Sequence, residues 1–117
     1  MSPRELLVLI IRDHGLRSSL IGRLSLRGEN LLTIERDPQD PELARLARPP
    51  AILIIDTEIL GDRLPALRQG SHWEAIVVLA PSAETVSDDE RVRVLDRQHA
   101  LAQLTETLDH WREQQPE

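Results

Sequence analysis

Apolar residues along the chain gather in four short runs that have the length of buried strands. The runs cover residues 6–11, 30–35, 51–55 and 75–80. Three of them are continuous rather than alternating, which is typical of strands covered on both faces in a parallel sheet. A fifth run, Arg91–Leu95, alternates polar and apolar side chains and suits a strand at the edge of the sheet. The pattern therefore predicts five strands.

Helical spacing of apolar residues occurs between these runs. Apolar positions between residues 16 and 24 recur at helical spacing, and Gly28 is placed to end that helix. Pro41 stands at the first position of a second helix, and a short helix is expected over residues 63–68. The last helix is amphipathic, with an apolar stripe made of Leu101, Leu104, Leu108 and Trp111.

Strands and helices that alternate in this way form right-handed βαβ units. The expected fold is a flavodoxin-like three-layer α/β/α sandwich with a five-stranded parallel sheet. The segment "PSAETVSDDER", residues 81–91, has little apolar periodicity, so the fourth helix is expected to be short or absent. Residues 1–113 are expected to form one domain, and residues 114–117 the start of a linker or a disordered tail.

Composition and charge exclude several functions. The 117 residues carry a formal net charge of −6, and every basic residue is an arginine, scattered rather than clustered. Without a basic face, direct nucleic-acid binding is not expected. The absence of cysteine excludes disulfides, thiol catalysis and cysteine-ligated metal sites. No apolar run has the length of a membrane span, and the first residues do not resemble a signal peptide, so a cytoplasmic domain without membrane contact is expected.

Two acids directly follow predicted strands, Asp13 after the first and Asp56 after the third. Ligands gather at the carboxyl ends of parallel strands, so we expect the two carboxylates to lie close together. Such a pair suits Mg²⁺, and one of them could attack a phosphoryl group. The simpler interpretation is that each acid caps the turn or helix behind it. Arg12 is expected to pair with Asp56 or Asp13 and to compete with the metal.

Four motifs resemble those of the receiver domains of bacterial response regulators: "IIRDHG", "ILIIDTE", "VVLAPS" and "VLDRQHALAQL". The resemblance covers nearly the whole chain. It implies that Asp56 stands at the phosphoacceptor position and Asp13 at a metal-binding acid. It also places the backbone carbonyl of Glu58 near the metal, and Arg97 where receivers have a lysine.

Three positions depart from the receiver pattern. Arg12 replaces a metal-binding acid, Ala80 replaces a hydroxyl residue (Ser82 lies two residues further), and Arg97 replaces the lysine. Alanine has no hydrogen-bond donor, and the planar guanidinium is not equivalent to an ammonium. The resemblance thus implies a degenerate acidic pocket, with a Mg²⁺ site at Asp13 and Asp56 that is weak or lost.

The segments "LRGEN", "IVVLAPS" and "RVRVLDR" are similar to the N-terminal receiver-like domain of the FleQ family of flagellar transcriptional activators. This similarity implies a C-terminal output domain with ATPase and DNA-binding parts, and it gives no reason to expect a histidine kinase. A pseudo-receiver that acts by protein contacts, without enzyme activity or cofactor, is favoured by the three departures. A phosphorylatable two-component receiver, with Asp56 as acceptor and Mg²⁺ as cofactor, is the alternative. Nothing beyond the fold favours a small enzyme.

Receivers commonly pair through their last helix, which implies a homodimer for this chain. The expected interface contains Leu104, Leu108 and Trp111. Trp111 stands near the end of the predicted helix beside Arg112, and both residue types are enriched at interfaces. We therefore expect Trp111 to remain partly exposed.

Overall fold

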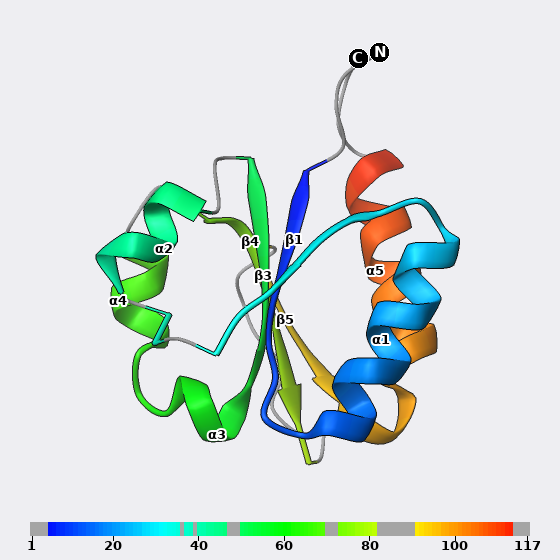
Figure 1. The fold of residues 1–117 in the computed structure, drawn as a ribbon, viewed down its shortest axis with the longest axis horizontal. Coiled ribbons are helices and arrows are strands. Elements are labelled where there is room, and N and C mark those ends of the chain that lie inside the picture. The colour runs from blue at the N-terminus through cyan, green and yellow to red at the C-terminus, as the bar shows by residue number, and fades with distance from the viewer. Residues whose placement is uncertain are drawn as a thin grey trace.

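Five parallel strands form one sheet in the computed structural model, which describes residues 5–35, 37–38, 40–46, 50–69, 73–81 and 91–113 (Figure 1). The strands are β1 (Leu6–Ile10), β2 (Asn30–Thr33), β3 (Ala51–Asp56), β4 (Trp73–Ala80) and β5 (Val92–Asp96). Their order across the sheet is β2-β1-β3-β4-β5. This is the order of the flavodoxin-like doubly wound fold, so the predicted fold class is confirmed.

Strand β3 lies at the centre of the sheet and is the most completely buried strand. All six of its residues are buried, including Asp56 at its end. Leu9 of β1 is in register with Ile54 of β3, and Ile55 is in register with Val78 of β4. The carboxyl ends of the central strands therefore meet at one edge of the sheet. Strand β5 lies at the side of the sheet, as its alternating pattern predicts.

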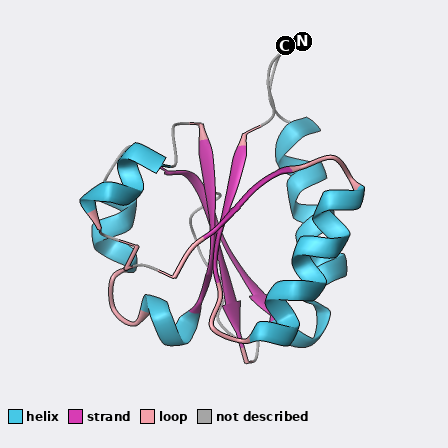
Figure 2. Cartoon of the chain, in the orientation of Figure 1, coloured by secondary structure: helices cyan, strands magenta, loops and turns pink. Residues whose placement is uncertain are grey.

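Helices cover both faces of the sheet (Figures 1 and 2). One layer contains α1 (His14–Leu26) and α5 (Ala100–Glu113), and the other contains α2 (Pro41–Leu46), α3 (Thr57–Leu60) and α4 (Leu64–Gln69). A 3₁₀ turn, η1 (Arg97–His99), leads from β5 into α5. The three-layer arrangement predicted from the alternation of strands and helices is confirmed.

Alternation of side chains along the strands divides the core into two parts. Leu7 and Leu9 of β1 pack in the part covered by α1 and α5, while Val8 and Ile10 pack in the part covered by the other helices. The buried side chains are almost all aliphatic, because the chain has no Phe or Tyr. Helices α1 and α5 contribute Leu20, Leu24, Leu104 and Leu108 to the first part.

Local signals set several helix boundaries where they were expected. Helix α1 is followed by Gly28, whose φ of 79° is open to glycine without a steric penalty. Pro41 is the first residue of α2. Helix α4 covers residues 64–69, close to the short helix expected there. The short helix α3 has no counterpart in the apolar pattern.

Two expectations fall on residues outside the described ranges. One is the short or absent fourth helix, because residues 82–90 are not described, and the other is the tail at residues 114–117. The extent of the domain stays a prediction. Among the helices in the described ranges, none is both long and apolar enough to cross a membrane.

Candidate functional site at the carboxyl ends of the strands

Asp56 is a buried carboxylate at the carboxyl end of the central strand. The residue is 1% exposed. It caps α3, because its Oδ1 accepts a hydrogen bond from the backbone N–H of Glu58 at 2.9 Å. The same oxygen accepts a hydrogen bond from Nη2 of Arg97. A buried carboxylate needs such partners, since burying an unpaired charge is costly. Asp56 is thus both a helix cap and one half of an ion pair.

Arg97 reaches Asp56 from two strands away. It is the first residue of η1, directly after β5, and β4 lies between β5 and β3. Strand β4 ends with Ala80, whose side chain has no hydrogen-bonding group. Nη2 of Arg97 also lies 3.8 Å from Oε1 of Glu58. The Nε of Arg97 is buried and has no hydrogen-bond partner among the described residues, so this site satisfies the guanidinium only in part.

Arg12 carries an ion pair with Glu58 rather than with either aspartate. Its side chain is 76% exposed, and its Nη1 lies 3.9 Å from Oε2 of Glu58. The positively charged group that pairs with the carboxylate of Asp56 is the guanidinium of Arg97. The expected pairing of Arg12 is therefore wrong, because Arg12 projects into solvent from the turn after β1, whereas Arg97 approaches across the strand ends.

Asp13 is the N-cap of α1. Its Oδ1 accepts a hydrogen bond from the N–H of Leu16 at 2.9 Å, and the residue is exposed. Asp96, at the end of β5, caps η1 in the same way through the N–H of Gln98, also at 2.9 Å. Strands β1, β3 and β5 therefore each lead into an aspartate that begins the next helical segment. Asp96 has this role although the strand pattern alone did not single it out.

Other contacts occupy one oxygen of each acid that was expected to bind Mg²⁺. Mg²⁺ requires a nearly octahedral set of oxygen ligands. Asp13 and Asp56 each use one carboxylate oxygen as a helix cap, and Arg97 binds that same oxygen of Asp56. Within the described ranges, no group of three or more His, Cys, Asp or Glu residues is placed to hold a metal ion. The buried carboxylate of Asp56 is paired with a positively charged side chain of the same domain, that of Arg97.

Glu58 belongs to this site through its side chain, which the sequence did not single out. The receiver resemblance gives it only a backbone carbonyl, but its carboxylate lies 3.9 Å from Arg12 and 3.8 Å from Arg97. Its position in the first turn after a strand end is the signal that could have found it. We refer to Arg12, Asp13, Asp56, Glu58 and Arg97 as the carboxyl-end cluster.

Two of the three residues expected at a dimer interface on the last helix are buried inside the domain. Leu104 and Leu108 are fully buried against the sheet within the domain, so their assignment to an interface is wrong. Their spacing places them on the face of α5 that the core requires. Trp111 is partly exposed and packs at the margin of the same core, and Leu101 is 36% exposed. Homodimerisation stays a prediction.

Arg112, expected near that interface, binds two glutamates instead. Its guanidinium donates hydrogen bonds to Glu29 at 2.6 and 2.8 Å and to Glu5 at 2.8 Å. Arg27 lies 2.6 Å from Asp109 and 3.5 Å from Glu29. We refer to these five residues as the amino-end network, because β1 and β2 begin there. Local sequence gives no signal for it, since Glu5 and Arg112 are 107 positions apart.

The amino-end network favours the charged form of Arg112. Hydrogen bonding to Glu29, and then to Glu5, raises the pKa of Arg112 above its ordinary value, against burial, which acts to lower it. A base whose pKa is raised on folding contributes stability at every pH below its ordinary pKa, and this contribution disappears only as the pH rises through the folded-state pKa. Near neutral pH the contribution of Arg112 is therefore present in full.

Comparisons of the chain with protein-family models, with curated proteins and with solved structures found no match. Ser82, the hydroxyl residue nearest to the receiver position, lies outside the described residues. The class of protein is therefore inferred from the strand order, the carboxyl-end cluster and the receiver-like motifs.

Proposed function

We propose that this domain is a pseudo-receiver, a regulatory domain that acts through protein contacts and without phosphoryl transfer. The observation that carries the proposal is the hydrogen bond from Arg97 to Asp56. A β2-β1-β3-β4-β5 sheet with an acid at the end of its central strand supports the receiver class. A guanidinium bound to that acid supports the loss of phosphoacceptor chemistry.

Phosphoryl transfer to Asp56 would need an available carboxylate oxygen with a metal ion beside it. The metal neutralises charge on the transferring group, and the attacking oxygen must lie in line with the leaving group. Oδ1 of Asp56 already accepts hydrogen bonds from Glu58 and Arg97, which reduces its nucleophilicity. Ala80 offers no hydroxyl to a phosphate oxygen. The transition state therefore lacks most of the electrostatic support that this reaction requires.

The hydrogen bond from Arg97 also pairs the carboxylate of Asp56 with a fixed positive charge. The guanidinium of Arg97 is always charged, and it supplies a positive charge to the carboxylate of Asp56. Regulation then depends on the protein surface, through pairing with a second copy and contact with an output domain. The similarity to FleQ-family N-terminal domains supports an output domain with ATPase and DNA-binding parts, acting in the cytoplasm.

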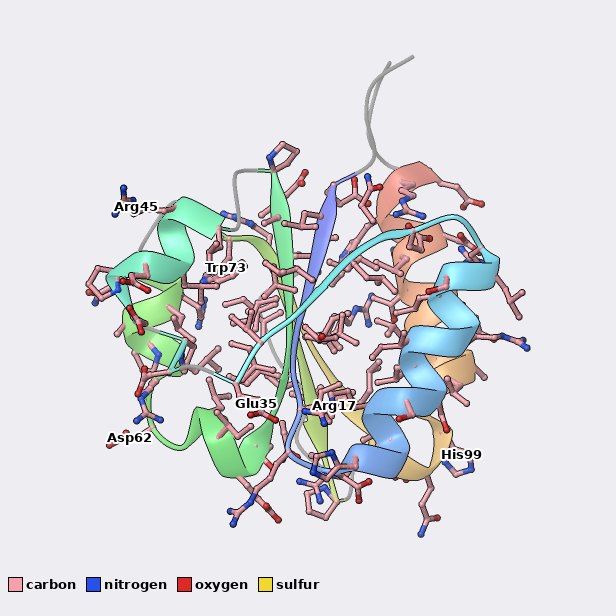
Figure 3. The ribbon with its side chains drawn as sticks, in the orientation of Figure 1. Arg17, Glu35, Arg45, Asp62, Trp73 and His99 are labelled. Atoms are coloured by element: carbon pink, nitrogen blue, oxygen red, sulfur yellow. The ribbon has the colours of Figure 1, made fainter. Side chains whose placement is uncertain are left out.

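Treatment with acetyl phosphate and Mg²⁺ tests this proposal. We expect intact-mass spectrometry to find the domain unmodified under conditions that label an ordinary receiver. Stoichiometric addition of one phosphoryl group, lost in Asp56→Asn and retained in Asp62→Asn, would favour the phosphorylatable two-component receiver instead. Asp62 is a matched control because it is an exposed acid in the same connection between β3 and β4 (Figure 3).

A rebuilt pocket makes the test sharper. The triple variant Arg12→Asp, Ala80→Thr, Arg97→Lys restores the three positions that depart from the receiver pattern. We expect it to gain Mg²⁺-dependent labelling that disappears when Asp56→Asn is added, because Asp56 would then have a metal ligand and a hydroxyl beside it. A folded triple variant that remains unlabelled would count against the receiver class itself.

A further inference from the structure

A cavity of about 480 Å³ lies at the carboxyl ends of β1 and β2, beside the carboxyl-end cluster. Its size is within the range of small-molecule sites. The walls come from the end of β1, the start of α1, the residues after β2, and α3 with the segment behind it. In the order β2-β1-β3-β4, the connections that leave the carboxyl ends of β1 and β3 run in opposite directions, and doubly wound folds bind ligands at this β1/β3 switch point. Ile10 at the end of β1 and Ile59 of α3, which follows β3, both line the cavity.

The floor of the cavity is apolar. Ile10 and Ile11, at the end of β1, are buried, while Ile34 and Ile59 are partly exposed. A ligand that covers the exposed parts of these isoleucines removes apolar surface from water, which favours binding. A flat ring system is a suitable group for such a floor.

Three arginines, Arg12, Arg17 and Arg63, line the cavity together with His14. Nη1 of Arg17 lies 3.3 Å from Oε1 of Glu35, and its Nη2 contacts Nδ1 of His14. Figure 3 shows Arg17 and Glu35 facing each other from α1 and from the end of β2. The Arg17 side chain is 19% and the Glu35 side chain 79% exposed, so Glu35 can move into solvent when an anion binds Arg17. Guanidinium groups bind phosphate through parallel N–H donors.

Two carboxylates, Glu35 and Asp37, line the cavity beside these arginines. The Glu35 side chain is 79% exposed, and Oδ2 of Asp37 lies 2.8 Å from Arg63. Three arginines against two carboxylates make the lining net positive, although the whole chain carries a charge of −6. A simple anion can use only the arginines, whereas a ligand that also has hydroxyl groups can donate hydrogen bonds to the carboxylates. Acidic residues bind ribose hydroxyls in this way in dinucleotide sites.

We propose that this cavity binds a nucleoside monophosphate. The base lies on the isoleucine floor, Arg12 and Arg17 bind the phosphate, and the ribose hydroxyls donate to Glu35 or Asp37. The three chemical parts of such a ligand match the three kinds of side chain that line the cavity. This inference does not rest on the proposed function, because Asp56 is not part of the cavity wall.

Titration of the ¹⁵N-labelled domain with AMP, GMP, CMP and UMP, followed by NMR, tests the proposal. We expect at least one nucleotide to give saturable shifts at the amides of the cavity wall, with a lower Kd than inorganic phosphate or the matching nucleoside. Arg17→Gln should raise that Kd about tenfold, because it removes a charge-assisted contact with the phosphate. Arg12→Gln should also raise it, and this change at a side chain that is 76% exposed preserves the fold. Arg23→Gln, on the exposed side of α1 and outside the cavity wall, should leave it unchanged.

Several results would overturn this inference. Absence of saturable binding for all four nucleotides is the first. Equal affinity for inorganic phosphate would indicate a general anion site, and equal affinity for the nucleoside would leave the arginines without a role. An equal effect of Arg23→Gln and Arg17→Gln would show that binding follows overall charge. None of these results changes whether acetyl phosphate labels Asp56, so failure here is distinguishable from failure of the proposed function.

Discussion

Both ends of the sheet hold buried carboxylates against arginines, but the two ends differ in how completely the groups are bonded. In the amino-end network, Arg112 donates two hydrogen bonds to Glu29 and one to Glu5. This joins the end of α5 to the segments that lead into β1 and β2 (Figure 1). In the carboxyl-end cluster, Arg97 binds one oxygen of Asp56, which a backbone N–H also uses.

Exposure does not distinguish the central pair at each end, because Arg97 and Asp56 are 25% and 1% exposed and Arg112 and Glu29 are 23% and 0% exposed. Outer members are exposed at both ends, since Glu58 is 54% exposed at one end and Asp109 is 54% exposed at the other. A buried ion pair stabilises a protein only when its geometry is good and its remaining bonds are satisfied, a condition that the amino-end network meets more fully. Arg112 makes three hydrogen bonds to buried glutamates and Arg97 makes one to Asp56. We therefore expect Arg112 to contribute more to stability than Arg97.

Arg112→Met should cause the largest loss of stability, about 3 kcal/mol, because it removes two charge-assisted hydrogen bonds from a buried carboxylate. That carboxylate belongs to Glu29, which loses two hydrogen bonds. Methionine keeps much of the length and the apolar stem of arginine. Urea unfolding followed by circular dichroism measures the change in the free energy of unfolding.

Arg45→Met is the matched control for this variant. Arg45 lies at the end of α2 and points away from the domain (Figure 3), so we expect a change of less than about 0.5 kcal/mol. Adding Glu29→Gln to Arg112→Met should recover part of the loss, because a neutral amide costs less to bury than a carboxylate. If Arg112→Met and Arg45→Met lose equal amounts of stability, the amino-end network has no structural role.

Arg97→Met should cost less, about 2 kcal/mol, since the variant removes one charge-assisted hydrogen bond to Asp56. Asp56 keeps its bond from the N–H of Glu58, and the Arg97 side chain is 25% exposed. The same urea experiment measures the loss. A loss larger than that of Arg112→Met would reverse the contrast between the two ends.

The double variant Arg97→Met, Asp56→Asn separates the charge from the contact. It should be more stable than Arg97→Met alone, because it removes the unpaired buried charge while the asparagine oxygen still caps α3. If the double variant is less stable than Arg97→Met, Asp56 does not depend on Arg97 for neutralisation. The main support for the proposed function would then be lost.

The fold could be predicted from the sequence because each buried strand corresponds to a short apolar run that can be recognised locally. The apolar run that became β3 is continuous, and a continuous run is what a strand covered on both faces requires. Strand ends moved by a residue or two in both directions: β2 ends at Thr33, earlier than expected, and β4 begins earlier, because its backbone pairing extends past the apolar run. Trp73, for example, pairs with Ala51 at the start of β4.

The sequence predicted residues of the site, because Asp13 and Asp56 follow strands and the receiver-like motifs place Arg97 in the same pocket. The pairing of Arg97 with Asp56 was not predicted, since Arg12 was the expected partner. Arg12 is next to Asp13 in sequence, whereas Arg97 is 41 positions from Asp56 and reaches it across an intervening strand. Such contacts depend on side-chain direction at the ends of different strands, which no local pattern records. The amino-end network was missed for the same reason.

Asp13→Ala should have the smallest of these effects, a loss of about 1 kcal/mol, which is typical for removal of an N-cap. The variant removes the acceptor for the N–H of Leu16 at the start of α1. Asp13→Asn keeps an oxygen at the same position and should retain nearly all the stability, since asparagine caps helices about as well as aspartate. Urea unfolding of the two variants therefore distinguishes a cap from a charge. If Asp13→Asn loses as much as Asp13→Ala, the negative charge of Asp13 stabilises the domain. The charge of Asp13 at the N-terminus of α1, rather than its hydrogen bond, would then account for the stability that this residue contributes.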